Sequence, residues 1–373
     1  MTRTSDVLVA GGGIAGLATI RALHLKGIQA SALEQRSEPT DQGLAINLPG
    51  NAIAALHALG LQEALEGYGK PVRRREYRTG SGRLLFAVDE QAFWGSTLTP
   101  RCMRRGDLTA LLAQGLPPDA IQWGTALASI EENPDHVHID TSQGRALSAG
   151  LLVGADGVNS TVRRLRFEGI TPSSAHLASA SWRFMAPNPG VESWTVWAGA
   201  KAMALLIPVS EQEVYGWAAA TGEHSQSADP GILGELLRGF PRPVRETVEA
   251  AMTGAHRLHY SPLDEVRLSS WSRGRTLLVG DAAHATAPVW AQGAALALED
   301  ALTLAKLIGC GSHWREVAAD YERLRRTRVE HVQAMTDRMS KAARLPTALR
   351  NLLLPFMGPR SYMETYGPLK API

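Results

Sequence analysis

The 373-residue sequence contains little cysteine and carries little net charge. Its two cysteines, Cys102 and Cys310, are too few for a disulfide framework or a cysteine-based metal centre, and they suit a reducing cytoplasm. The formal net charge is only +2, which argues against a nucleic-acid-binding surface. We therefore expect a cytoplasmic protein with no metal site and no nucleic-acid partner.

Long apolar runs are also missing. No stretch reaches the ~18–20 apolar residues that a membrane-spanning helix needs, so no membrane span is predicted. Hydrophobic residues make up 45% and charged residues 20% of the chain, which is an ordinary balance for a globular protein. At roughly 100–200 residues per domain, the length allows two domains.

The most informative stretch that is present runs from Asp6 to Glu34. An apolar strand-like run leads into the pattern Gly11-x-Gly13-x-x-Gly16, a helix-forming segment follows, and a second strand-like run ends at Glu34. A βαβ unit with glycines at its first turn is typical of dinucleotide binding. The sequence therefore predicts a Rossmann-type nucleotide site at this turn.

Each residue of this pattern has an expected part in the site. Gly11 allows a tight turn, Gly13 lets a pyrophosphate approach the backbone, and Gly16 lets the helix pack closely on the strand. The helix N-terminus offers free N–H groups and a positive dipole end to phosphates. Glu34 ends the second strand, where a carboxylate can accept hydrogen bonds from ribose hydroxyls.

Two later stretches repeat the order of an apolar strand followed by a polar turn. They are Asp156-Gly157 and Gly280-Asp281. Either aspartate could also be an ordinary capping residue at a strand-to-helix turn. The interpretation as parts of a site depends on their occurring together with the first turn.

The middle of the chain has a different pattern, with alternating strand-like segments and four of the nine tryptophans. An antiparallel sheet inserted into the nucleotide-binding domain explains this change. Its expected strands cover residues 178–185, 193–198, 202–208 and 214–219. Tryptophans in such a sheet usually lie in the core, although some could form a flat apolar wall for an aromatic substrate. A charged helix is expected over residues 314–342, with its arginines Arg323, Arg325, Arg326 and Arg328 on a solvated face.

Taken together, the three turns resemble those of the FAD-dependent aromatic hydroxylases, the para-hydroxybenzoate and salicylate hydroxylase family of single-component flavoprotein monooxygenases. The resemblance covers most of the chain in order and spacing, and the middle sheet matches least. It implies an α/β protein with a glutathione-reductase-like FAD-binding Rossmann domain, an inserted, mainly antiparallel β-sheet substrate domain and C-terminal helices. The expected FAD-binding domain comprises residues 1–72, 101–174 and 262–312, the substrate domain 73–100 and 175–261, and the helical segment 313–373.

The resemblance also implies roles for individual residues. Arg105 fits the arginine that reaches the FAD phosphates, and Arg104 is the competing candidate. Asp156 and Gly157 would serve both FAD and the reduced nicotinamide, and Asp281 would accept a hydrogen bond from the ribityl chain. The full set of expected cofactor-binding residues is Gly11, Gly13, Ile14, Ala15, Gly16, Glu34, Gln35, Arg36, Arg105, Asp156, Gly157, Gly280, Asp281, Pro288, Gln292, Gly293, Ala294 and Ala295.

The helix expected to begin at Gln292-Gly293 would point its N-terminus at the flavin pyrimidine ring, and Pro288 would lie beside the isoalloxazine. Because reduced flavin carries negative charge there, a helix N-terminus would stabilise it. The sequence departs from the family just before this helix. Ala291 replaces a common glycine but removes no donor, so FAD should still bind, whereas Trp290 could narrow the pocket or stack near the ring.

The activity that the resemblance implies is NAD(P)H-dependent hydroxylation of an aromatic or other electron-rich small molecule by O2, through a flavin C4a-hydroperoxide. FAD would be bound without a covalent link. NADH or NADPH would bind transiently, because the sequence holds no second G-x-G-x-x-G pattern. The expected substrate contacts are Trp182, Arg183, Tyr215 and Trp290.

Some properties stay open at this point. No catalytic base can be named, and the protein could be a monomer or a homodimer. The alternatives to hydroxylation are a flavin halogenase, a Baeyer–Villiger oxygenase, a dehydrogenase or a non-catalytic flavin-binding protein.

Overall fold

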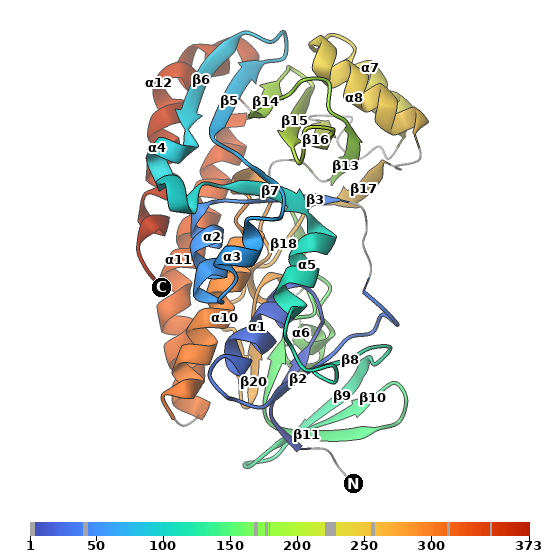
Figure 1. The fold of residues 1–373 in the computed structure, drawn as a ribbon, viewed down its shortest axis with the longest axis vertical. Helices are drawn as coiled ribbons and strands as arrows, with labels where there is room; N and C mark the ends of the chain where they lie inside the picture. Colours follow the sequence, from blue (N-terminus) through green and yellow to red (C-terminus); the bar gives the residue numbers. More distant parts are fainter. Residues whose placement is uncertain are drawn as a thin grey trace.

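The computed structural model describes residues 4–39, 44–167, 171–175, 178, 180–220, 229–254, 258–311, 314–343 and 345–373. Parts of the expected domain ranges, residues 221–228 among them, lie outside the described residues. Two large sheets, one at each end of the long axis, are joined by a helical layer (Figure 1).

The first sheet has eight strands and a parallel centre. Its main path runs in the order β19-β20-β11-β1-β2-β8, and β10 and β9 continue from β11 as an antiparallel extension. The central strands are covered on both faces, which explains their nearly continuous apolar sequences. The strands are β1 (Thr4–Ala10), β2 (Ala30–Leu33), β8 (Ile121–Gln122), β9 (Leu127–Glu132), β10 (Val137–Thr141), β11 (Ala146–Gly154), β19 (Ser272–Arg273) and β20 (Thr276–Leu278).

This strand order brings the three predicted turns together. The neighbouring parallel strands β20, β11 and β1 all end at the same edge of the sheet. The turn after each strand leads into a helix, namely α1 (Ile14–His24), α6 (Thr161–Arg166) and α9 (Asp281–His284). Ligands of open parallel sheets bind outside this carboxyl edge.

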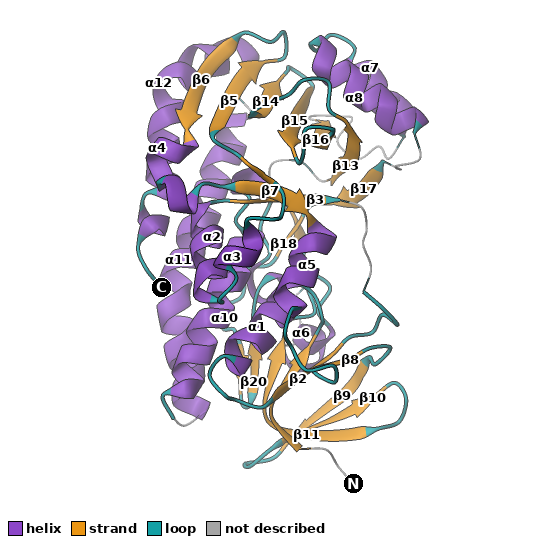
Figure 2. Cartoon of the chain, viewed as in Figure 1, coloured by secondary structure: helices purple, strands orange, loops and turns teal. Residues whose placement is uncertain are grey.

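The second sheet has seven strands in the order β17-β13-β16-β15-β14-β5-β6 and is antiparallel except where β14 pairs with β5. Helices α7 (Pro230–Leu237) and α8 (Arg242–Thr253) cover its outer face (Figure 2). The strands are β5 (Arg74–Thr79), β6 (Leu84–Asp89), β13 (Ala180–Pro187), β14 (Trp194–Ala198), β15 (Ala202–Pro208), β16 (Glu213–Ala220) and β17 (His259–Pro262).

Between the sheets lie the remaining elements. They include α2 (Gly50–Ala58), α4 (Glu90–Trp94), α5 (Arg105–Ala113) and α10 (Gly293–Gly309), with a small sheet of β3 (Ala45–Leu48), β7 (Arg101–Arg104) and β4 (Lys70–Pro71). The long helices α11 (Trp314–Ala343) and α12 (Thr347–Tyr366) run along one side of both sheets (Figure 1). None of the helices in the described ranges is both long and apolar enough to cross a membrane.

Candidate active site

A cavity of about 800 Å3 lies between the carboxyl edge of the first sheet and the inner face of the second. Its lining includes residues of all three predicted turns. The predicted residues that line it are Gly11, Gly13, Ile14, Ala15, Glu34, Gln35, Arg36, Arg105, Asp156, Gly157, Asp281, Pro288, Gly293, Ala294, Arg183, Tyr215 and Trp290. The structure therefore brings together segments that are far apart in the chain, from Gly11 to Ala294.

The glycines of the first turn are constrained by their neighbours. A Cβ at Gly16 would lie 1.8 Å from the Gly11 carbonyl oxygen, and one at Gly11 would lie 2.4 Å from the Ala155 carbonyl oxygen. Gly13, in contrast, faces open space within the described structure. The packing glycines therefore keep the turn tight, and Gly13 leaves its backbone accessible from the cavity.

Glu34 is tied to the same turn. Its Oε2 accepts a hydrogen bond from the Gly12 N–H at 2.7 Å, and its Oε1 accepts one from the Arg36 N–H at 3.0 Å. The carboxylate is 7% exposed and lines the cavity. It thus orders the glycine turn while leaving further oxygen lone pairs for a ligand.

Asp156 has a structural role. Its Oδ2 accepts hydrogen bonds from the N–H groups of Thr161 and Val162, and Ser160 Oγ lies 2.5 Å from Oδ1. Burial raises the pKa of Asp156, and the Ser160 hydrogen bond opposes this rise. The Asp156 carboxylate therefore binds the first N–H groups of α6, whose capping residue is Ser160, and its part in cofactor binding stays a prediction.

Arg105 and Arg104 differ in what they contact. Arg105 lines the cavity, where desolvation lowers its pKa and the Asp281 carboxylate opposes this change. Arg104 instead forms an ion pair with Glu213 at 2.6 Å. Of the two competing candidates, only Arg105 lines the cavity. Its charge interacts with those of Arg36 and Arg183, and the Asp281 carboxylate offsets part of this positive charge.

Asp281 begins α9, a helix whose capping residue is Gly280. Its side chain is exposed within the cavity lining. Two features require a glycine at position 280. Its φ is 58°, and the turn passes so close to α1 that a Cβ would lie 2.9 Å from that of Ala15. Gly280 thus packs behind the site, and Asp281 faces into it.

The segment before α10 is strained. Ala291 has a φ of 53°, the only left-handed non-glycine residue in the described part of the chain. The Gln292 side chain is buried and exchanges two hydrogen bonds with the Asn51 amide, at 3.0 and 3.1 Å. Gly293 and Ala294, at the N-terminus of α10, line the cavity, whereas Gln292 and Ala295 lie beneath it.

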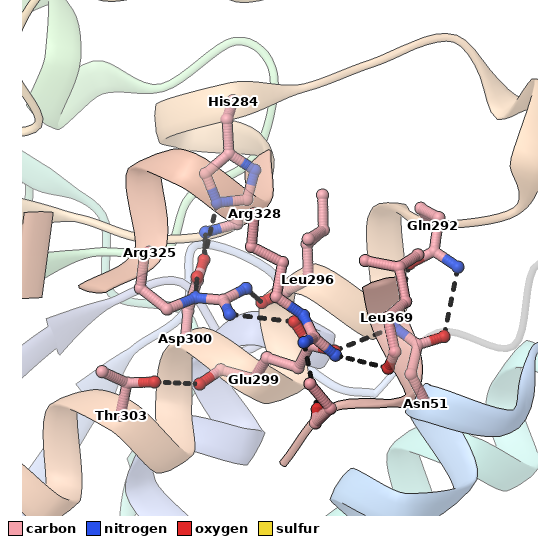
Figure 3. A network of polar contacts seen from close by, with 12 residues as sticks. Asn51, His284, Gln292, Leu296, Glu299, Asp300, Thr303, Arg325, Arg328 and Leu369 are labelled. Atoms are coloured by element: carbon pink, nitrogen blue, oxygen red, sulfur yellow. Dashed lines mark hydrogen bonds and ion pairs between the residues drawn. The ribbon is translucent and has the colours of Figure 1, made fainter. Parts of the chain in front are cut away.

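A buried network of charges contacts the turn at Gly280 (Figure 3). Asp300 Oδ2 accepts from the Gly280 N–H at 2.9 Å and lies 2.7 Å from His284 Nε2. Asp300 Oδ1 and Glu299 Oε2 both contact Arg325, at 2.7 and 2.9 Å. Burial alone raises the pKa of Asp300, but His284 and Arg325 outweigh it and hold that pKa well below its ordinary value.

The same network continues to the helix N-terminus. Glu299 Oε1 accepts hydrogen bonds from Asn51 Nδ2 and Arg328 Nη2, each at 2.8 Å. Because Asn51 also binds Gln292, the network links α11 to the first residues of α10. The prediction of a solvated arginine face was wrong for Arg325, which is 1% exposed. Two adjacent carboxylates inside the apolar run of α10 were the signal that called for buried counter-charges.

A second buried network holds Trp290. Its carbonyl oxygen accepts from the Tyr366 hydroxyl at 2.6 Å, and the two rings meet edge to face. Arg75, which pairs with Glu90 at 2.6 Å, donates to the same Tyr366 hydroxyl and lies 4.3 Å from the centre of the Trp194 ring. Trp290 therefore packs largely against α12 and is 2% exposed, although it still contributes to the cavity lining.

The inner face of the second sheet forms the opposite wall. Alternate residues of β13 to β16 line the cavity, as the two-residue period of a strand requires. They are Arg183, Trp194, Val196, Ala198, Met203, Leu205, Ile207, Tyr215 and Trp217. Tyr77, Arg78 and Leu85 of β5 and β6 line it too, at the point where the pairing of these two strands shifts register. Burial raises the pKa of Tyr215 to about 12 against the opposing effect of Arg183, so its hydroxyl remains a hydrogen-bond donor at neutral pH.

The prediction for Trp182 is contradicted by this geometry. Trp182 is 1% exposed and packs against Tyr260 on the face that α7 and α8 cover. Neighbouring strand residues point to opposite faces, so Trp182 and Arg183 cannot both reach the cavity. The tryptophans of this sheet that do line it are Trp194 and Trp217, which were considered only as part of a general apolar wall. The alternation along β14 and β16 was the signal that identifies them.

Comparisons with known proteins agree with this geometry. Residues 4–338 match the family model described as FAD binding domain. The chain belongs to this family. It is 30% identical over 342 residues to 2-heptyl-3-hydroxy-4(1H)-quinolone synthase of Pseudomonas aeruginosa. The aligned region covers 88% of this chain and 86% of that protein. It is also 30% identical over 357 residues to 3-amino-4-hydroxybenzoate 2-monooxygenase PtmB3 of Streptomyces platensis. This alignment covers 91% of this chain and 89% of that protein.

Solved structures show the same fold. The structure of Klebsiella pneumoniae HpxO complexed with FAD and uric acid superposes with a TM-score of 0.84 at 23% identity, covering 98% of this chain and 94% of that one. The expected α/β flavoprotein fold, the resemblance to the FAD-dependent aromatic monooxygenases and FAD as the cofactor are thereby confirmed. The division into domains stays a prediction.

The first turn of this FAD-binding protein fits a dinucleotide pyrophosphate. The capping residue of α1 is Gly13, which has no side chain to occupy the helix N-terminus, and the first turn of α1 contains no acidic residue. Gly13, Ile14 and Ala15, at the uncapped start of α1, line the cavity together with Arg36 and Arg105, and a helix N-terminus of this kind can bind a phosphate. The described residues contain no cluster of three or more histidine, cysteine or acidic side chains that is placed to hold a metal ion.

Proposed function

We propose that this FAD-dependent monooxygenase uses NADH or NADPH and O2 to hydroxylate an electron-rich aromatic ring. The observation that supports this function is that one cavity joins a dinucleotide-binding edge, which carries Arg36 and Arg105, to an apolar, aromatic wall. Relatives whose names describe aromatic monooxygenases support the same reaction class.

FAD would be held without a covalent bond by the residues predicted for it that line the cavity. The backbone of Gly13, Ile14 and Ala15, with Arg105, would bind the pyrophosphate. Glu34 would bind the adenosine ribose, and Asp281 would accept a hydrogen bond from the ribityl chain. Asp156 and Gly157 would contribute mainly through their backbone, since the Asp156 carboxylate is already engaged with α6.

When bound, FAD would supply the redox chemistry, in which the nicotinamide reduces the flavin and the reduced flavin activates O2. The N-terminus of α10 would stabilise negative charge on the ring beside Gly293. The apolar wall would exclude water and orient the substrate. Arg183 and Tyr215 would donate hydrogen bonds to an oxygen on the substrate ring, and the raised pKa of Tyr215 keeps its proton available for this.

The test is a turnover experiment with the purified, yellow holoenzyme. Denaturation should release FAD rather than FMN. With phenols or quinolones, we expect substrate-dependent oxidation of NADH or NADPH, oxygen uptake, and a product that has gained one oxygen on its ring. A chloride requirement would favour a halogenase, oxygen insertion next to a carbonyl would favour a Baeyer–Villiger oxygenase, and an absence of turnover with FAD bound would exclude the proposal.

A further inference from the structure

The cavity extends well beyond the three turns. From the turns it continues along the inner face of the second sheet to the C-terminal helices, as an arm that we call the distal arm. Its walls include Leu85 of β6, Val196 and Ala198 of β14, Met203 of β15, Met339 of α11 and Leu354 of α12. The arm is therefore bounded by the outer part of the second sheet on one side and by α11 and α12 on the other.

Contacts at the two ends of β14 give the direction and length of the arm. Trp194 at its start lies against Arg75, which is joined through the Tyr366 hydroxyl to the carbonyl of Trp290 beside the turns. Ala198 at its end accepts a hydrogen bond from Arg350 of α12 at 2.9 Å. At ~3.3 Å per strand residue, the arm runs roughly 13 Å from the first point to the second.

The chemistry of the distal arm is apolar. Arg78, one of the two cations in its lining, forms an ion pair with Glu76 at 2.7 Å. Arg350, the other, donates through Nη2 to the carbonyls of Ala198 and Gly199, while its Nε has no partner within the described residues. Val196, Ala198 and Leu85 are each less than 9% exposed, whereas Met203, Met339 and Leu354 are half-buried, so the arm is shielded from solvent mainly on the side of β6 and β14. A chain that fills such a space gains free energy for each methylene group that leaves water.

We propose that the distal arm binds an apolar chain several carbons long, carried by the aromatic ring of the substrate. This inference rests on the proposed function, which places the ring at the turns. It adds that the second sheet and the C-terminal helices together select substrates with a long alkyl or prenyl-type substituent. A small aromatic acid would leave the arm unfilled.

The experiment measures equilibrium binding of phenol, 4-propylphenol and 4-heptylphenol to the oxidised holoenzyme without nicotinamide. The readout is the change in absorbance of the bound flavin. We expect the Kd to fall by as much as about three- to fourfold for each added methylene, up to the length of the arm. Hydroxylation of the same compounds is assayed separately.

Matched variants on α12 separate the arm from unspecific binding. Leu354→Trp should fill the arm and abolish the gain from the longer chain. Leu352→Trp adds the same ring on the same helix but at a side chain that is 65% exposed, and it should leave the gain unchanged. Thermal unfolding of both variants shows whether each is folded.

Three outcomes would overturn the inference. They are a Kd that does not depend on chain length, an equal chain-length gain in both tryptophan variants, and tighter binding of 7-(4-hydroxyphenyl)heptanoate than of 4-heptylphenol. The last result would make Arg350 a receptor for a carboxylate. If binding depends on chain length but no compound is hydroxylated, the proposed function is rejected, and the distal arm is still a binding site for an apolar chain.

Discussion

Asp300, in the middle of α10, accepts a hydrogen bond from the backbone N–H of Gly280 at 2.9 Å. A fully buried carboxylate thus fixes the turn that presents Asp281 to the cavity. Arg325 on α11 compensates its charge at 2.7 Å. The position of the candidate ribityl contact consequently depends on a helix from the C-terminal part of the chain.

Replacing Asp300 with asparagine should destabilise the protein strongly. The variant leaves Arg325 without one of its two buried counter-charges, and breaking a buried ion pair costs about 3–5 kcal/mol. Urea unfolding at neutral pH measures the change. Asp320→Asn, which removes an exposed partner of Arg323, is the control and should change the free energy of unfolding by less than ~1 kcal/mol. Equal effects of the two variants would contradict a structural role for the network.

The same residue predicts a pH dependence. His284 and Arg325 hold the pKa of Asp300 below its unfolded value of about 3.9. A lowered folded-state pKa means that the stabilisation is complete above the unfolded pKa and is lost as the pH falls towards the folded one. The wild type should therefore lose stability below roughly pH 4 more steeply than Asp300→Asn. Parallel acid limbs in denaturant unfolding would show that Asp300 does not contribute.

Arg105 and Arg104 offer a paired test of phosphate binding. Arg105→Ala should weaken FAD affinity by roughly ten- to a hundredfold, because a hydrogen bond to a charged group contributes about 1.5–3 kcal/mol. Arg104→Ala, which loses only the ion pair with Glu213, should bind FAD nearly as the wild type does. Fluorescence titration of the apoprotein with FAD compares them. The reverse order of effects would transfer the role to Arg104.

Asp281→Ala should separate a cofactor role from a capping role. The α9 turn is capped at Gly280, so removing the Asp281 side chain should change apoprotein stability by no more than ~0.5 kcal/mol. FAD affinity should fall by roughly ten- to a hundredfold. Both quantities are measured on one preparation. A less stable apoprotein that still binds FAD normally would mean that the aspartate only shapes the turn.

Ala291→Gly should stabilise the protein. A left-handed backbone costs a residue with a Cβ about 1–2 kcal/mol, whereas glycine adopts it freely but gives up about 0.5–1 kcal/mol of chain entropy. The expected net gain is of the order of 0.5–1 kcal/mol in urea unfolding. Ala295→Gly, inside α10, serves as a control that should destabilise by a similar amount. A loss of stability in Ala291→Gly would exclude strain at this turn.

The sequence predicted the parts of the site that depend on local pattern. The strand, glycine turn and helix around Gly13 can be read within one window, and so can the turns at Gly157 and Asp281. The strand order β20-β11-β1 then brings them to one edge.

The parts that escaped prediction depend on side-chain direction and distant partners. Whether Trp182 or Arg183 faces the cavity depends on which face α7 and α8 cover, and no local signal gives that. Arg325 was predicted to be one of several exposed arginines, whereas it forms buried ion pairs with Glu299 and Asp300. No local signal links Asn51 to α10, and yet its amide is shared between Gln292 and Glu299.

The parallel pairing of β14 with β5, in which Trp194 lies opposite Arg75, bears on how the chain is made and folded. During synthesis, β5 leaves the ribosome more than about 100 residues before β14, which covers its edge. The edge of β5 therefore stays unpaired until β14 has been made. Contacts so distant in sequence also slow folding. A fragment limited to residues 180–262 would keep β13 to β17 but expose the edge of β14, and such fragments should aggregate rather than fold.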